Sequence, residues 1–585
     1  MLGNLKPLKP YLLKYRRQFF WGGISVLGNN LIWILFPQVL GKASNALNRG
    51  VTRHKLLTYS LALLAIAFSK GIFQFLTRWI MIGISREIEF DLRNDLFTHL
   101  ERLSHSFYQR TRTGDIMAKA TNDLNAVRQL LGPAIMYTAN TVVFTAGALL
   151  FMLRISPRLT LFAFLPLPVA SIMVQYFGRR IHERFEKIQA TFSDISARAQ
   201  ENFSGVRVVR AYAQEEAEIE LFEVSNREYI ARSLTLVRLM GMLWPTLEAL
   251  LGLAIILVLW LGGREVLLHR MNVGDFVAYN TYMVQLTWPV IALGWVINLF
   301  QRGTASMGRI NQLLIEKPAI TDAEVAPDLR EVKELTGDIE FRNLSFAYDG
   351  ANGTTILRNI NLKVPAGSSL AIVGPTGSGK STLVSLVPRI YDAPSGSVLI
   401  DGRPIREYPL EVLRRNIGFV PQETFLFSDT IRENIAFGVD HATDQEVHAA
   451  AEAANIAGDI EGFPLQYATM VGERGITLSG GQKQRTAIAR AIIRDPRILV
   501  LDDALSSVDT YTEERILHHL REIMAGRTTI FISHRVSTVK DADQIAVLHG
   551  GEIVELGTHQ ELLNQNGYYA DLYNKQLLEE ELASV

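Results

Sequence analysis

The stretch Gly374-Pro-Thr-Gly-Ser-Gly-Lys380-Ser381-Thr382 decides the fold of the C-terminal half of the chain. An apolar run at 369–373 precedes it and is typical of a buried strand, and an amphipathic run at 381–390 follows it and indicates a helix. Glycines at such a turn let backbone N–H groups point inward around a polyphosphate, at a helix N-terminus that favours anions. Lys380 would then pair with the β and γ phosphates, and the Ser381 hydroxyl would offer an oxygen to Mg²⁺. The pattern predicts an α/β P-loop nucleotide-binding domain.

Two further motifs extend this nucleotide site. The apolar strand expected at 497–501 leads into Asp502, a position that suits a carboxylate held beside Mg²⁺ at the carboxyl edge of a parallel sheet, and Asp503 follows it. Leu478-Ser479-Gly480-Gly481-Gln482 opens a helix expected at 483–493, so its amides form a second anion-binding helix end. One nucleotide needs only one such loop for its phosphates. The chain therefore carries a spare phosphate cap.

In these motifs the chain resembles the ATP-binding cassette (ABC) superfamily, and specifically its exporter branch, over nearly its whole length. The resemblance implies that the signature 478–482 of one subunit covers the γ-phosphate held by the glycine loop of another, which accounts for the spare cap. It also implies that Tyr348 stacks on adenine. Gln422 would touch Mg²⁺ and link the nucleotide site to the membrane domain, and His534 would contact the γ-phosphate.

Two more landmarks stand in the order that the family has. Ser507-Val508-Asp509 matches the loop through which two cassettes sense each other, and Val471-Gly-Glu-Arg-Gly475 matches an exporter-specific segment before the signature. In full, the resemblance implies catalytic roles for Asp503, His534 and Gln422, Mg²⁺ contacts from Ser381, Gln422 and Asp502, and ATP contacts from Tyr348, Gly374, Pro375, Thr376, Gly377, Ser378, Gly379, Lys380, Ser381 and Thr382. Leu478, Ser479, Gly480, Gly481 and Gln482 would serve the nucleotide of the partner.

Asp503 departs from the family pattern, which has glutamate at this position to polarise the attacking water. Its side chain is one methylene shorter, so its carboxylate retreats by ~1.5 Å. A displacement near 1 Å can cost about a hundredfold in rate when a reactant must be aligned. We therefore expect this chain to bind ATP well and hydrolyse it slowly, as one half of a heterodimer whose partner, a second half-transporter, bears the glutamate. Such an arrangement resembles the heterodimeric bacterial multidrug exporters. A homodimer in which Asp503 performs adequately is the alternative.

The first half of the chain is expected to cross a membrane. Hydrophobic residues make up 48% of the sequence, and six stretches have the roughly 20 apolar residues that a spanning helix needs. We therefore predict a six-helix transmembrane domain at 1–315, a linker at 316–336, an ATP-binding cassette at 337–578 and a tail at 579–585. The six helices are expected near 18–42, 57–84, 131–153, 159–178, 239–263 and 276–301.

The placement of basic residues predicts how these helices are oriented. Lysines and arginines precede the first span and crowd 86–128 and 179–238, which marks these faces as cytoplasmic, although the loop 42–56 is also basic. The N-terminus and the cassette are thus expected on the cytoplasmic side, and the resemblance to bacterial exporters implies that the membrane is a bacterial inner membrane. The long polar stretches resemble helices prolonged into the cytoplasm in the exporter family, with coupling turns at 107–115 and 201–210, the second of which should reach the partner's cassette.

Charges and composition limit the other functions that the chain could have. Lys70 and Glu248 lie mid-span, and each should face the bundle interior or a wet cavity. They could contact substrate, or they could form a mutual pair or snorkel without a role in substrate binding. The formal net charge is zero and no basic stripe suggests nucleic acid. The chain has no cysteine, so structural disulfides and thiolate metal sites are excluded.

Together these features predict ATP-driven export of small hydrophobic or amphipathic molecules from a lipid membrane by alternating access. Lipid flipping, peptide export, siderophore import and an ATP-gated channel or regulator remain alternatives, because substrate contacts in such cavities are spread over several helices.

Overall fold

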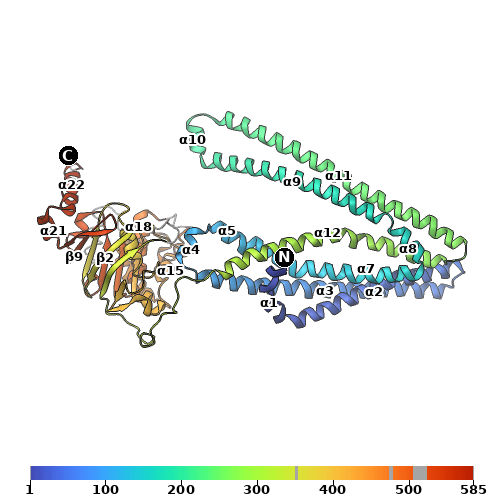
Figure 1. The fold of residues 1–585 in the computed structure, drawn as a ribbon, viewed down its shortest axis with the longest axis horizontal. Coiled ribbons are helices and arrows are strands. Elements are labelled where there is room, and N and C mark those ends of the chain that lie inside the picture. The colour runs from blue at the N-terminus through green and yellow to red at the C-terminus, as the bar shows by residue number, and fades with distance from the viewer. Residues whose placement is uncertain (1, 349–353, 473–477, 505–522, 584–585) are drawn as a thin grey trace. The chain divides into compact units, whose positions relative to one another are not determined.

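The computed structural model describes residues 2–348, 354–472, 478–504 and 523–583 of the 585-residue chain. The chain divides into two compact units (Figure 1). Unit 1 comprises Met1–Phe97 and Met117–Leu313, and unit 2 comprises Thr98–Ile116 and Leu314–Val585. The segment Thr98–Ile116, which contains the first predicted coupling turn, therefore belongs to the same unit as the cassette.

Unit 1 is helical, and within the described residues it supplies five helical runs that are long and apolar enough to cross a membrane. They are Arg16–Asn48, Arg53–Glu101, Thr113–Ile155, Glu215–Leu267 and Val273–Ile315. The helices are α1 (Lys9–Lys14), α2 (Arg16–Asn48), α3 (Arg53–Glu101), α5 (Thr113–Ala118), α6 (Leu124–Gln129), α7 (Ile135–Ile155), α8 (Pro157–Phe164), α9 (Leu167–Ser204), α10 (Val206–Ala211), α11 (Glu215–Leu267) and α12 (Val273–Ile315), with a 3₁₀ turn η1 (Leu2–Leu8) and π-helical turns η2 (Lys119–Asp123) and η3 (Leu130–Ala134).

The fourth predicted span, 159–178, does not form one helix. It is divided between α8 and α9 at Leu165 and Pro166, and neither helix is among the five candidate spans of the described residues. Pro166 and Pro168 give the reason, because proline lacks the N–H that would continue the helical hydrogen bonds. The other five predicted spans lie within or overlap the five candidate helical runs.

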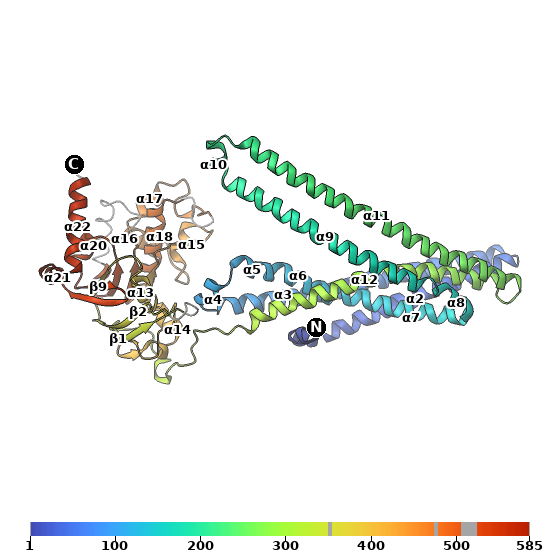
Figure 2. The same ribbon diagram turned by 45° about the horizontal axis from the view of Figure 1, so that its top comes forward.

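The helices α9 and α11 run side by side as a long hairpin with α10 at its turn (Figures 1 and 2). The N–H of Gly205 donates to the carbonyl of Glu201 at 2.8 Å, which closes the end of α9 before α10 begins. The second predicted coupling turn, 201–210, thus lies at the tip of this hairpin. Its contact with a partner cassette stays a prediction.

The described residues of unit 2 form two sheets. A four-stranded antiparallel sheet has the order β2-β1-β4-β5, and a six-stranded sheet has the order β10-β9-β3-β8-β7-β6, parallel except for its edge strand β10. The strands are β1 (Ile339–Phe346), β2 (Leu357–Val364), β3 (Ser369–Val373), β4 (Val398–Ile400), β5 (Arg403–Pro404), β6 (Ile417–Val420), β7 (Ile498–Asp502), β8 (Thr528–Ile532), β9 (Gln544–His549) and β10 (Glu552–Gly557).

Helices complete unit 2, and three of them adjoin the motifs that the sequence analysis singled out. α13 (Lys380–Ser385) follows the glycine loop, α18 (Gly480–Ile492) follows the signature and α4 (His105–Arg110) belongs to the segment Thr98–Ile116. The other helices of its described residues are α14 (Leu410–Arg415), α15 (Ile431–Ala436), α16 (Asp444–Ala453), α17 (Ala457–Glu461), α20 (Val536–Val539), α21 (His559–Gln565) and α22 (Tyr568–Ala583), with 3₁₀ turns η4 (Pro327–Leu329), η5 (Ile405–Glu407) and η6 (Gln466–Ala468).

The parallel strands are buried on both faces, which explains why they read as continuous apolar runs. Alternate residues of β3 enter two different cores, as expected for side chains that alternate across a strand. Ala371 and Val373 pack with α16 and α18, whereas Leu370 and Ile372 pack with α13 and the antiparallel sheet. This arrangement leaves the carboxyl ends of the parallel strands as the edge at which polar residues gather.

Candidate nucleotide site

The glycine loop between β3 and α13 has a backbone that only glycine adopts readily. Gly374, Gly377 and Gly379 have φ of +148°, +81° and +102°. A Cβ atom at Gly374 would lie 2.1 Å from the carbonyl oxygen of Leu548, so close packing also requires glycine there. The loop therefore has the turned backbone that the phosphate-binding pattern predicts. The helix that follows is shorter than predicted, since α13 ends at Ser385 instead of reaching residue 390.

Lys380 closes the glycine loop from inside. It is only 6% exposed, and its Nζ donates to the carbonyl oxygens of Gly374 and Pro375 at 2.8 and 3.0 Å. Burial lowers the pKa of this ammonium, while the charges of Asp503 and Asp502 act in the opposite direction. A buried cation held by neutral carbonyls favours an incoming anion, because a phosphate would restore part of the solvation that burial removes.

Ser378 gives a separate indication of a ligand in the same loop. Its hydroxyl oxygen is buried and has no hydrogen-bond partner in the described part of the chain, although the residue is only 4% exposed. Buried hydroxyls normally find partners, so an orphaned one beside a glycine loop fits a phosphate oxygen. The loop thus contains both a buried cation and a buried hydroxyl that has no partner among the described residues.

Ser381 and Asp502 meet at the end of β7. The Ser381 hydroxyl donates to Oδ1 of Asp502 at 2.9 Å, and Asp502 is only 4% exposed. Burial raises the pKa of Asp502, and the neighbouring charge of Asp503 raises it further, while Ser381 and Lys380 lower it. A bound divalent cation would favour the ionised form of this carboxylate.

Few protein ligands for a metal come together at this site. Among the described residues, no group of three or more histidine, cysteine, aspartate or glutamate side chains could hold a metal ion. Mg²⁺ bound with a nucleotide needs only one or two protein oxygens, because phosphates and water supply the others. The pair Ser381 and Asp502 fits that requirement.

Neighbouring parallel strands bring the remaining predicted residues to one edge of the sheet. Asp503 follows β7 with φ of +49°, and its N–H donates to the carbonyl of Ile532 at 3.2 Å. His534 follows the adjacent strand β8, and Gln422 follows β6 on the other side of β7; both side chains are exposed. Because these strands are parallel neighbours, their carboxyl ends place Asp503, His534 and Gln422 beside Asp502 along this edge.

Tyr348, predicted to stack on adenine, lies after β1, and both its hydroxyl and its ring make contacts. Its hydroxyl hydrogen-bonds the Thr382 hydroxyl at 2.8 Å, and its ring meets those of Phe346 and Tyr391 edge-on, with centroids 5.2 and 4.9 Å apart. The sequence analysis missed Tyr391. Its signal, an aromatic residue between Ile390 and Asp392, is weak without knowledge of its neighbours.

The signature forms the N-terminus of α18, as predicted. Ser479 is the N-cap: its Oγ accepts from the Gln482 N–H at 3.3 Å, and the Gln482 side chain accepts from the Ser479 N–H at 3.0 Å. Leu478 is buried, whereas Ser479 and Gly480 are exposed and Gly481 is half-buried. Within the described ranges, no hydrogen bond joins the signature to the glycine loop. Asp509 and the segment 473–475 lie outside the described residues.

The two charges predicted within the membrane helices do not pair. The Lys70 ammonium lies 3.9 Å from the centroid of the Trp33 ring, a cation–π contact. No ion pair joins Lys70 to Glu248 in the part of the chain that the structure describes, so the mutual pair expected as one alternative is wrong.

Long apolar helices followed by a P-loop α/β cassette define a membrane protein that uses a nucleotide, the architecture of an ATP-driven transporter. Family models support this assignment: the ABC transporter transmembrane region matches residues 19–290, and the ABC transporter model matches residues 357–506. The chain belongs to the ATP-binding cassette transporter family. It is therefore a multi-pass membrane protein that binds ATP and couples its hydrolysis to transport.

Individual relatives cover nearly the whole chain. The chain is 38% identical to the "Probable multidrug resistance ABC transporter ATP-binding/permease protein YheI" of Bacillus subtilis (strain 168). The alignment spans 580 residues, which are 99% of this chain and 98% of the relative. The chain is also 38% identical to an ATP-dependent lipid A-core flippase of Desulfotalea psychrophila. That alignment spans 520 residues, which are 88% of this chain and 89% of the relative.

A solved structure of a bacterial Atm1-family ABC exporter with ATP bound aligns with a TM-score of 0.77 at 31% identity. The alignment covers 96% of this chain and 98% of that one. These similarities confirm the predicted fold class and the resemblance to ABC exporters.

Proposed function

We propose that this chain exports small hydrophobic or amphipathic molecules as the slowly hydrolysing half of a heterodimer. The observation that carries the proposal is Asp503, a short carboxylate that follows Asp502 directly at the end of β7, in a chain whose signature is intact. Because the side chain of Asp503 is shorter than glutamate, attack of water on the ATP bound by this chain is slow. The intact signature can still complete the ATP site of a partner. The similarity to a multidrug resistance transporter supports the substrate class.

Each predicted site residue keeps a role in this proposal. Tyr348 and the loop 374–382 hold ATP, with Lys380 against its terminal phosphates. Ser381, Gln422 and Asp502 hold Mg²⁺, which when bound neutralises charge on the β and γ phosphates. Asp503 and His534 orient the attacking water. The carboxylate of Asp503 lies ~1.5 Å farther from that water than the carboxylate of a glutamate would.

Transport follows from nucleotide-driven association of two cassettes. The glycine loop of each chain and the signature of the other, Leu478–Gln482, close around one ATP, with Asp509 sensing the opposite cassette. Closure favours the outward-facing state, and loss of the γ-phosphate contact after hydrolysis reopens the pair. The coupling turns at 107–115 and 201–210 carry this change to the helices.

We further propose the organisation within the membrane. The transmembrane domain extends over 1–315, the linker over 316–336, the cassette over 337–578 and the tail over 579–585. The chain lies in a bacterial cytoplasmic membrane with its N-terminus and cassette in the cytoplasm, in agreement with the basic residues that flank the spans.

Transport in inside-out vesicles tests this function. Vesicles containing this chain together with a half-transporter that bears the glutamate should accumulate ethidium, a hydrophobic cation, when Mg·ATP is added. Vesicles with this chain alone should accumulate it slowly. Equal, rapid uptake by the solitary chain would favour the homodimer, and no uptake in either case would count against export of hydrophobic drugs.

Lipid flipping is the second candidate, favoured by the 38% identity to a lipid A-core flippase. The same vesicles, labelled with a fluorescent phospholipid analogue, distinguish it. ATP-dependent movement of the lipid without uptake of ethidium would assign the chain to this function.

A further inference from the structure

Tyr391 contacts both the segment Thr98–Ile116 and the residue proposed to stack on adenine. Gln109, on α4, donates a hydrogen bond from Nε2 to the Tyr391 hydroxyl at 2.6 Å. The ring of His105 meets the Tyr391 ring edge-on with centroids 5.5 Å apart. On its other side the Tyr391 ring meets Tyr348, 4.9 Å away. One side chain thus joins the coupling segment to the nucleotide site.

The contact continues from Tyr348 into the glycine loop. The Tyr348 hydroxyl hydrogen-bonds the hydroxyl of Thr382, on the first turn of α13. A nucleotide that stacks on Tyr348 and binds the loop therefore fixes both ends of this contact. Since aromatic rings are rigid and interact through defined geometries, a displacement of Tyr348 changes its contact with Tyr391.

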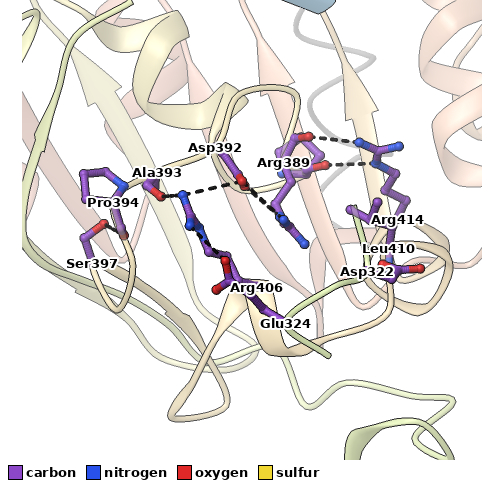
Figure 3. A network of polar contacts seen from close by, with 11 residues as sticks. Asp322, Glu324, Arg389, Asp392, Ala393, Pro394, Ser397, Arg406, Leu410 and Arg414 are labelled. Carbon is purple, nitrogen blue, oxygen red and sulfur yellow. Dashed lines mark hydrogen bonds and ion pairs between the residues drawn. The ribbon is translucent and has the colours of Figure 1, made fainter. Parts of the chain in front are cut away.

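The backbone around Tyr391 is held in place by a polar network (Figure 3). Arg389 is 2% exposed and has φ of +51°, and its guanidinium donates to the carboxylate of Asp392 at 2.9 Å. Arg414 donates to the carbonyl oxygen of Arg389 at 2.9 Å. The backbone on both sides of Tyr391 is therefore restrained, and movement is left to its side chain.

The linker takes part in the same network. In Figure 3 Arg406 lies between Asp392 and Glu324, at 3.5 and 3.3 Å. At the start of the linker Glu316 pairs with Arg110, one residue after Gln109. The segment Thr98–Ile116 thus keeps a second attachment to the rest of unit 2 that does not depend on the Tyr391 hydroxyl.

We propose that Tyr391 is a positioning residue that transmits nucleotide binding from Tyr348 to the segment Thr98–Ile116. The inference rests on the proposed function, since it takes ATP as the molecule that contacts Tyr348. The restrained backbone keeps Tyr391 between Tyr348 and the segment, and the hydrogen bond from Gln109 gives the segment a contact that changes when the Tyr391 ring shifts with Tyr348.

Hydrogen exchange of the full-length chain in lipid nanodiscs tests this role, with and without ATP. In the unmodified chain ATP should slow amide exchange across Thr98–Ile116 by about twofold to tenfold, the range that one hydrogen bond supplies. Tyr391→Phe removes the hydroxyl and keeps the ring, so ATP should bind with unchanged affinity while this slowing is lost. A role confined to stability would instead change exchange equally with and without ATP.

Two further variants make the result specific. Gln109→Ala should give the same loss, and the double variant should lose no more than either single one, because both remove one contact. Tyr408→Phe is the matched control, since it also removes a tyrosine hydroxyl from the cassette, one that donates to the Ile400 carbonyl at 3.0 Å. It should keep the ATP-dependent slowing.

An unchanged response in Tyr391→Phe overturns the inference, as does an unmodified chain in which ATP binds without slowing exchange in the segment. Failure of the proposed function is distinguishable, because it appears as an absence of ATP-dependent transport in vesicles of the unmodified protein.

Discussion

The hydroxyl of Ser381 donates a hydrogen bond to the carboxylate of Asp502 at 2.9 Å, although the two residues are 121 positions apart in sequence. This contact joins the first turn of α13 to the end of β7, the two elements that supply the proposed Mg²⁺ ligands. Since burial raises the pKa of Asp502, the affinity of the site for Mg²⁺ depends on pH.

The pH dependence has a definite sign. Mg²⁺ binds the ionised carboxylate, so a raised pKa means that Mg·ATP affinity falls as pH decreases through the raised value, earlier than for an ordinary aspartate. The same shift stabilises the protein without ligand at low pH, and this contribution is lost as pH rises through the raised pKa. Asp502→Asn should weaken Mg·ATP binding and remove the part of the pH profile that belongs to this group. Titration calorimetry at several pH values measures both, and an unaltered profile in the variant would argue against Asp502 as the ligand.

Lys380→Met should weaken ATP binding by about tenfold to a hundredfold, the range of a hydrogen bond to a charged group. The ammonium is buried against the loop carbonyls, so its removal takes away the charge that a phosphate would meet. Fluorescence titration with a nucleotide analogue measures the change. Lys540→Ala, at an exposed lysine of the same unit, is the control and should bind normally.

Gly374→Ala should destabilise the protein by roughly 2 kcal/mol or more. Residue 374 has a positive φ, and its Cβ atom would lie 2.1 Å from the backbone oxygen of Leu548. Gly458→Ala is the matched control. That glycine lies inside α17 with open space around its Cβ position, so alanine should be neutral or should stabilise by about 0.5–1 kcal/mol. Thermal unfolding in detergent compares the two; similar losses in both would contradict the close packing at the loop.

Asp123→Ala should destabilise unit 1 by about 1–3 kcal/mol. Asp123 is buried on the π-helical turn η2 and accepts hydrogen bonds from Ser306 at 2.9 Å and from Arg309 at 2.9 and 2.5 Å, both on α12. The variant leaves Arg309 without its carboxylate. Chemical unfolding followed by tryptophan fluorescence measures the loss, and Asp194→Ala, at an exposed carboxylate of α9 in the same unit, should have little effect.

The sequence predicted those parts of the site that local patterns encode. The strand at 369–373 is confirmed as β3, and the strand before Asp502 is confirmed within one residue as β7, because buried parallel strands are continuous apolar runs. The helix after Lys380 was predicted too long: α13 ends at Ser385, and apolar periodicity does not reveal that the chain then turns, with Arg389 in a left-handed backbone.

Other features depend on contacts that no local pattern contains. Gln109 and Tyr391 are 282 residues apart, so neither the importance of Tyr391 nor the place of Thr98–Ile116 in unit 2 could be inferred from spacing. The division of the fourth predicted span at Pro166 was visible in the sequence, but hydropathy over a long window averages across it.

ATP turnover by the purified chain alone, before and after Asp503→Glu, tests the central claim most directly. We expect slow single-turnover hydrolysis in the unmodified chain and an increase of about a hundredfold when the carboxylate regains ~1.5 Å of reach. Equal, rapid hydrolysis by both forms would contradict the account of a slow site that depends on a partner.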